Sequence, residues 1–120
     1  LHWSRVEGPH GGALLDVGRP GETDALIVGW PQVIRWDDGK FRMYYHTLDP
    51  QQRYVVCWAE SADGLRFAKR GVIMEPGPAG RFDDQGVATR HIVRHDGRWV
   101  MFYEGCGRTG RPMEVNRQLG

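Results

Sequence analysis

Two aspartates, Asp24 and Asp83, stand at matching places in the chain. Each ends a stretch rich in Gly, with Pro nearby, and 59 residues separate them (83 − 24). A pair of carboxylates suits a reaction in which one group donates a proton and the other accepts one or attacks. Asp also closes turns by hydrogen-bonding the backbone. The chain contains two similar stretches, and the presence of an Asp at the same place in both favours such a shared structural role. Catalysis and turn formation both stay open for these two residues.

Four further side chains with binding chemistry lie at the ends of predicted strands. Trp30 opens one strand, Arg90 and His91 open its counterpart, and Glu104 ends a strand at the place that His46 has in the first copy. An indole stacks on flat ligand faces, and a guanidinium binds oxygen-rich groups. We predict that Trp30, Arg90, His91 and Glu104 bind a ligand, with packing at the rim of the fold or exposure to solvent as the alternatives.

No cofactor or metal site is predicted. His91 and His95 lie four residues apart on one strand, hence about 13 Å apart at roughly 3.3 Å per residue, which is too far for one metal ion. The sequence contains no phosphate-binding Gly loop, no Ser-His-Asp order and no zinc spacing. Cys57 and Cys106 have no CxxC spacing, and we expect both as buried reduced thiols.

The elements that must position these residues are copies of one unit. The stretch VIRWDDGKFRMYYHT (residues 33–47) returns as IVRHDGRWVMFYEG (residues 92–105), and residues 12–28 align with residues 71–87. The offset falls from 59 to 58 in the hairpin turn, where the first copy has one more residue. Self-similarity at a fixed period indicates stacked or radially repeated units, each unable to bury its hydrophobic face alone. The chain holds about two such units.

Alternation of side chains predicts the strands within each unit. Phe41, Met43 and Tyr45 fall on one face of a strand that follows the hairpin signal Asp38-Gly39. A third strand is predicted at residues 54–59, with Val55, Cys57 and Ala59 on one face, and a short charged fourth strand at residues 66–70. Four meandering strands in one repeat describe a propeller blade. The predicted fold is all-β, a partial β-propeller of about two four-stranded antiparallel blades, the second incomplete.

We divide the chain into four segments. Residues 1–11 are a remnant of a preceding blade or an irregular N-terminal segment, and residues 12–70 are the first blade with its leading crossover. Residues 71–105 are the second, incomplete blade. Residues 106–120 have neither alternation nor an Asp-Gly turn, so they are expected to be an irregular C-terminal tail.

Composition narrows the class of protein. Of the 120 residues, 40% are hydrophobic and 26% charged, which is ordinary for a globular domain. The net charge of +1 is spread without runs, which argues against a nucleic-acid partner. No apolar run approaches the roughly 20 residues of a membrane helix, and no signal sequence opens the chain. Compartment and oligomeric state are left open.

Several motifs together resemble one known superfamily. They are Gly-Arg-Phe-Asp at residues 80–83, an Asp-Gly hairpin before a strand that ends in Met-Phe-Tyr-Glu-Gly, and AESADGLRF at residues 59–67. In this order they resemble the five-bladed β-propeller glycosidase superfamily, which holds arabinanase, invertase and levansucrase-like hydrolases and mannoside phosphorylases. The resemblance covers residues 12–105.

This resemblance implies a carbohydrate ligand and cleavage of a glycosidic bond by carboxylates at the propeller axis, roughly 5 to 9.5 Å apart. Such carboxylates come from different blades, often as an Asp just before a Pro on the innermost strand. Here the matching positions are Trp30 before Pro31 and Arg90 before His91, and neither is a carboxylate. This departure argues against catalysis by these two blades, since two blades of five do not hold the full set of carboxylates. Asp24 and Asp83 are the catalytic candidates that the chain offers.

Three functions stay open. The parent protein is a glycosidase-like enzyme, or it is a non-catalytic sugar-binding or scaffolding propeller, or the chain has no independent activity. We expect the last for these 120 residues alone and the first for a longer parent.

Overall fold

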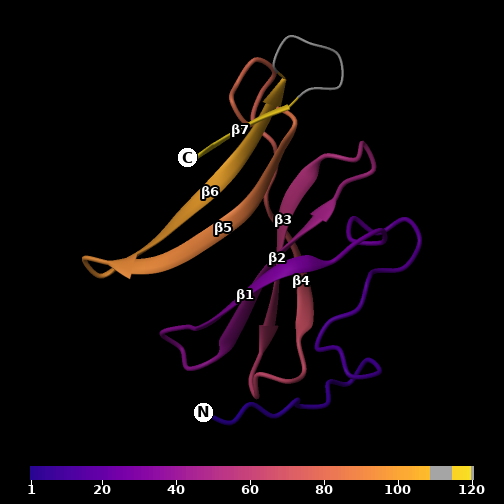
Figure 1. Cartoon of the computed structure of the whole chain (residues 1–120), viewed down its shortest axis with the longest axis vertical. Helices are drawn as coiled ribbons and strands as arrows, with labels where there is room; N and C mark the ends of the chain where they lie inside the picture. Colours follow the sequence, from indigo (N-terminus) through magenta and orange to yellow (C-terminus); the bar gives the residue numbers. More distant parts are fainter. Residues whose placement is uncertain (109–114, 120) are drawn as a thin grey trace.

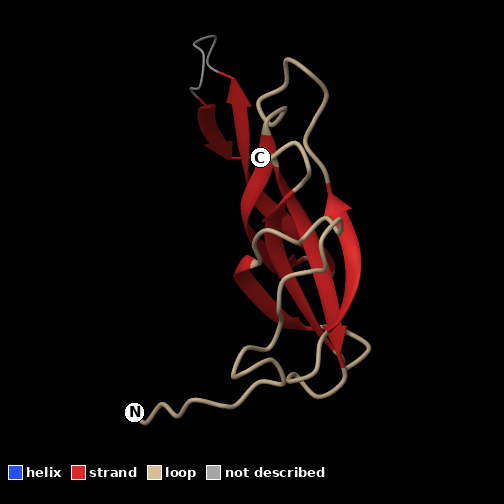
Figure 2. Cartoon of the chain, turned by 90° about the vertical axis from the view of Figure 1, so that its right-hand side faces the viewer, coloured by secondary structure: helices blue, strands red, loops and turns tan. Residues whose placement is uncertain are grey.

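The computed structural model describes residues 1–108 and 115–119, which form seven β-strands and no helix (Figures 1 and 2). The strands are β1 (Gly29–Arg35), β2 (Phe41–Leu48), β3 (Tyr54–Ser61), β4 (Ala68–Met74), β5 (Gly86–His95), β6 (Arg98–Arg108) and β7 (Val115–Leu119). Their order in the sheet is β1-β2-β3-β5-β6-β7, with β4 paired to β3. The predicted all-β, partial-propeller fold is confirmed. In the described part of the chain, no helix is present that could cross a membrane.

The first four strands form an antiparallel meander, the first blade. Val33 on β1 faces Met43 on β2, and Tyr45 on β2 faces Cys57 on β3, which in turn pairs with Val72 on β4. The predicted Asp-Gly turn joins β1 to β2, with Gly39 at φ 82°, a conformation that glycine adopts without the steric cost of a side chain. Strand β4 runs on to Met74. The predicted boundary after residue 70 therefore falls inside a strand.

The second blade contains β5, β6 and β7. Ile92 on β5 faces Met101 on β6, and Arg108 at the end of β6 pairs with Val115 on β7. The predicted irregular tail is therefore wrong for residues 106–108 and 115–119, while residues 109–114 and 120 lie outside the described part. Ladder hydrogen bonds join backbone groups, so β7 forms without the apolar alternation that a sequence pattern detects.

Strand β5 of the second blade lies against both β3 and β1 of the first blade. One parallel bridge pairs Tyr54 with Gly86, and the Gln32 side-chain amide bonds both backbone groups of Ile92, donating to its carbonyl at 3.1 Å and accepting from its N–H at 2.9 Å. At the other end of β1, Trp36 stacks on Trp99 with ring centroids 4.3 Å apart. In Figure 1 the β5–β6 pair lies beside the first blade and leans away from it.

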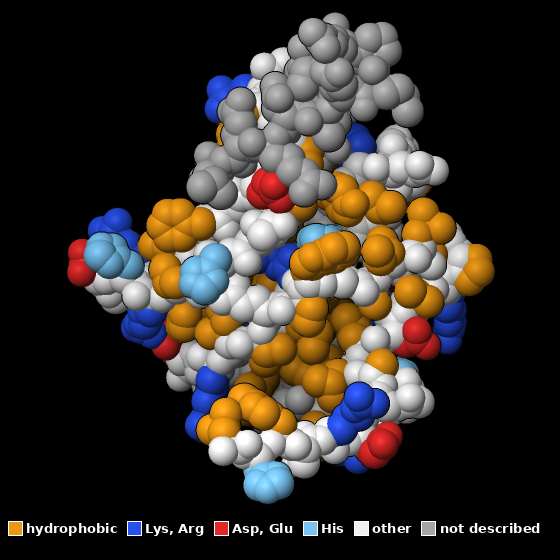
Figure 3. Space-filling model, viewed as in Figure 1, with side chains coloured by type: hydrophobic (Ala, Val, Ile, Leu, Met, Phe, Trp, Pro, Cys, Tyr) orange, Lys and Arg blue, Asp and Glu red, His pale blue; other side chains and the backbone are white. Residues whose placement is uncertain are grey.

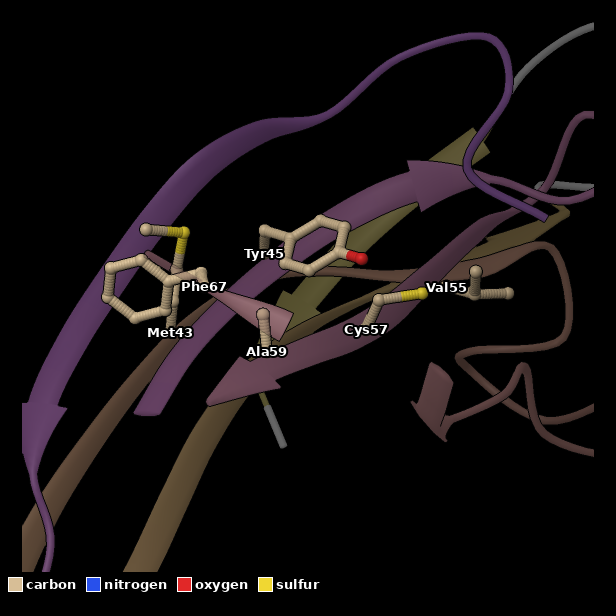
Figure 4. Packing of buried hydrophobic residues seen from close by; sticks show 6 residues of the cluster. All are labelled: Met43, Tyr45, Val55, Cys57, Ala59 and Phe67. Atoms are coloured by element: carbon tan, nitrogen blue, oxygen red, sulfur yellow. The ribbon is translucent and has the colours of Figure 1, made fainter. Parts of the chain in front are cut away.

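One hydrophobic core cluster lies on one face of the first blade, where β2 and β3 carry most of its side chains (Figure 4). It consists of Met43, Tyr45, Val55, Cys57, Ala59 and Phe67. Partly buried hydrophobic residues from the leading segment, Leu14, Leu15 and Val28, cover it. The alternation predicted for β2 and β3 is confirmed. Both cysteines are buried, as predicted.

The molecule exposes more surface than a compact chain of its mass. Its accessible surface is 8369 Å², against about 6,600 Å² for a compact 13.7 kDa monomer, and its radius of gyration is 15.7 Å against about 13.6 Å. Hydrophobic side chains surround a hollow on the face seen in Figure 3. The seven-stranded sheet thus forms an open arc rather than a closed body.

Candidate functional site

Strands β1 and β5 are both irregular at their first residues. The β1–β2 register shifts between Gly29 and Gln32, and the β5–β6 register shifts between Ala88 and Arg90. Inside these bulges Trp30 has φ 48° and Thr89 has φ 21°, a backbone region that non-glycine residues rarely adopt. The two residues lie 59 apart (89 − 30), the offset of the repeat. A bulge that re-aims a side chain at the start of the inner strand is therefore a property of the repeat unit.

Trp30 projects a large aromatic surface from the first bulge. Its indole stacks on the His46 ring, with centroids 4.4 Å apart and planes at 29°, while 60% of the residue is exposed to solvent. His46 also meets the edge of the Tyr54 ring at 5.2 Å. With its inner face supported by His46, the indole offers the remaining surface to a ligand.

Arg90 lies buried between the two blades. Its Nη2 donates hydrogen bonds to the carbonyl oxygens of Trp30 and Tyr44, and its Nη1 lies 3.4 Å from Nδ1 of His46. Burial lowers the pKa of Arg90 to about 10, so the guanidinium keeps its charge at neutral pH. The Arg90 side chain therefore connects β5 of the second blade to β1 and β2 of the first.

His46 is held as a neutral imidazole. Burial, assisted by the charge of Arg90, lowers the pKa of His46 to about 4. A neutral ring that accepts at Nδ1 from Arg90 carries its proton on Nε2. That Nε2 is buried, as is Nε of Arg90, and neither has a hydrogen-bond partner within residues 1–108 and 115–119.

A pocket opens where the two bulges meet. It has a volume of about 280 Å³ and is lined by Trp30, Pro31, Gln32, Thr89, Arg90 and His91. This volume is near the lower end for small-molecule sites. The lining combines one exposed indole, one buried cation and hydrogen-bonding side chains, and it includes no carboxylate.

Three of the four predicted ligand-binding residues, Trp30, Arg90 and His91, converge in this pocket. Glu104 pairs with Ala88 across the β5–β6 ladder, half-buried and outside the set that lines the pocket. Matching Arg90 to Trp30 was wrong by one residue, because the bulges place Thr89 as the equivalent of Trp30.

Sequence reasoning did not assign His46, Gln32 and Thr89 to the site. The fixed offset of 59 (89 − 30) could have found Thr89. No sequence signal pointed to His46 as a support for Trp30.

The two aspartates lie elsewhere, each within its own repeat. The Tyr45 hydroxyl donates to Oδ2 of Asp24 at 2.9 Å, and the Tyr103 hydroxyl donates to Oδ2 of Asp83 at 3.0 Å. Burial and these hydrogen bonds raise the pKa of both tyrosines above the ordinary value. Asp24 also pairs with Lys69 at 2.7 Å. Each carboxylate thus anchors its crossover loop to the second strand of its blade.

Matching glycines make room for these carboxylates. A Cβ on Gly18 would lie 2.2 Å from Oδ1 of Asp24, and a Cβ on Gly77 would lie 2.1 Å from Oδ1 of Asp83. The backbone N–H of each glycine donates to the carbonyl of the same aspartate, at 2.9 and 3.1 Å. The same arrangement of glycine, aspartate and tyrosine therefore recurs in both repeats, which fits the structural role for the two aspartates. The catalytic assignment of Asp24 and Asp83 stays a prediction.

Tyr45→Phe and Tyr103→Phe test this anchoring role. Each variant is expected to lower the free energy of unfolding by about 1.5 kcal/mol, since each removes a hydrogen bond to a charged group. Urea unfolding of the chain measures the change, and Tyr54→Phe is the matched control because its ring packs against His46. Unchanged stability in both variants would contradict the anchoring role.

Comparisons with known proteins bear on the fold. No family model matches the chain, and no curated protein matches it. A solved structure described as "Glycoside hydrolase" matches with a TM-score of 0.61 at 19% sequence identity. The match covers 84% of this chain and 30% of that one, so the chain spans less than a third of that structure's length. The chain therefore has a fold similar to part of a glycoside hydrolase.

Proposed function

We propose that the chain is part of a carbohydrate-active five-bladed propeller of the glycosidase type, and that these two blades bind sugar in the pocket between β1 and β5. The observation that carries this proposal is the exposed Trp30 indole, re-aimed by a bulge and backed by His46, beside the buried Arg90. Aromatic faces give sugar rings a large apolar contact. The structural neighbour, a glycoside hydrolase, supports a carbohydrate ligand.

Binding is favoured over catalysis for these two blades. The bulge positions, where the resemblance expects a carboxylate, hold Trp30 and Thr89. Asp24 and Asp83 are each buried and hydrogen-bonded to a tyrosine. Because each carboxylate is held by a tyrosine of its own repeat, we assign glycosidic-bond cleavage to carboxylates of further blades in a longer protein. The division into blades at residues 12–70 and 71–105 is part of the same proposal, with the first blade extended to Met74.

Trp30→Ala tests the binding role. The variant is expected to bind sugars at least roughly tenfold more weakly, because a truncated aromatic anchor costs about 2 kcal/mol at a binding site. NMR titration of the chain with monosaccharides measures affinity and shows whether the indole N–H of Trp30 and the amides of Thr89 and His91 shift. Trp3→Ala, which removes a tryptophan that is 86% exposed and does not line the pocket, is the control.

Two results would contradict the proposal. One is that no sugar binds the chain, and the other is that Trp30→Ala and Trp3→Ala bind equally well. Turnover of an aryl glycoside by the chain itself would contradict a purely binding role, and Asp24→Asn and Asp83→Asn would then show which carboxylate acts.

A further inference from the structure

We infer that the pocket between β1 and β5 selects sugars that carry an anionic group, a carboxylate or a phosphate, and that Arg90 supplies the complementary charge. This inference rests on the proposed sugar-binding function and names the class of its ligand.

The first support is that Arg90 has no counter-charge among the residues that the structure describes. Its partners are two carbonyl oxygens and the neutral imidazole of His46. None of the ion pairs that join residues of the described part includes Arg90. A buried charge without an opposite partner costs several kcal/mol. An anionic ligand would therefore regain more free energy here than at a site whose arginine is already paired.

The second support is the charge of the surroundings. The residues that line the pocket include no Asp or Glu. His91 adds an imidazole to the lining of the pocket, whose ring nitrogens can hydrogen-bond a ligand.

The third support is a hydrogen-bond donor that the fold does not use. Nη2 of Arg90 is occupied by the carbonyls of Trp30 and Tyr44, but Nε is buried with no partner in the described part of the chain. The contacts within the fold therefore do not use all five N–H groups of the guanidinium, and low local polarity strengthens the attraction of its charge to an anion in the pocket. The arrangement predicts that the anionic group of the sugar interacts with Arg90 while Trp30 contacts the ring of the same sugar.

The test compares isosteric ligands on the unmodified 120-residue chain. Glucuronate and glucuronamide differ in charge but hardly in shape, and glucose 6-phosphate against glucose provides the phosphate arm. We expect the charged member of at least one pair to bind roughly tenfold more tightly, as one charge-assisted hydrogen bond would give. The preference should shrink in 0.5 M salt, and the arm with the larger ratio identifies the anion.

Variants and free anions complete the test. Arg90→Lys keeps the charge and should retain part of the preference, whereas Arg90→Gln should abolish it, with NMR spectra confirming that each variant is folded. Equal binding of charged and uncharged members overturns the inference but leaves sugar binding intact. No binding of any sugar overturns the proposed function as well. Acetate or inorganic phosphate binding as tightly as the sugar anions supports the charge site and overturns its selection of sugars.

Discussion

Replacing Arg90 by methionine is expected to lower the free energy of unfolding by about 3 kcal/mol. The guanidinium satisfies the buried carbonyls of Trp30 and Tyr44 and the imidazole of His46, and each acceptor left unpaired costs about 1–3 kcal/mol. Methionine also removes a buried charge that is costly to desolvate, so the net loss stays below the sum of the three. Because Arg90 joins the two blades, the loss should appear as reduced cooperativity between them.

Urea unfolding monitored at both blades measures this effect. Arg94→Met is the matched control, since Arg94 is about half exposed and pairs with an exposed Asp37, and exposed ion pairs contribute about 0–1 kcal/mol. If Arg90→Met unfolds with the same midpoint and slope as the unchanged chain, Arg90 is not the link between the blades.

The second large effect is a loss of stability in mild acid. His46 has a pKa of about 4 in the folded chain against 6.5 ordinarily. In the unfolded chain His46 therefore binds a proton over a range of pH where it does not in the folded chain. The free energy of unfolding falls as the pH is lowered from about 6.5 toward 4. At about 1.4 kcal/mol per pKa unit, the free energy of unfolding should fall by about 2 kcal/mol between pH 7 and pH 5.

His46→Gln separates this effect from the titration of carboxylates. Glutamine keeps an acceptor for Arg90 but has no proton to gain, so the variant should lose clearly less stability over the same pH interval. Parallel pH profiles for the two chains would show that His46 is not the group responsible. Direct NMR titration of the His46 ring gives an independent reading of its pKa.

Local signals account for the parts of the fold that could be predicted. Alternation in β2 and β3 identified Met43, Tyr45 and Cys57 as core residues, because successive side chains of a strand point to opposite faces. Asp38-Gly39 marked the hairpin through the positive φ that its glycine adopts. The repeat then carried both assignments to β5 and β6. These features depend on neighbours in the chain, and the sequence by itself determined them.

Backbone pairing and irregular backbone geometry explain why the other features of the fold could not be predicted from the sequence. Strand β7 is held by backbone groups of β6, which leave no pattern in side-chain types. The bulges at Trp30 and Thr89 break the period of two, so alternation along the strand does not show which way these side chains point. Asp24 and Asp83 were correctly recognised as repeated residues, but their tyrosine partners became known only from the structure.

The sequence by itself determined the strands other than β7, the two main turns, the repeat and the residue types available for binding. Tertiary structure alone decided that Arg90 would contact His46, 44 residues away, and Trp30, 60 residues away. The physical reason is that a buried charge and a neutral imidazole are created by the packing of one blade on the next. Burial of this kind belongs to no single segment, and so no local pattern encodes it.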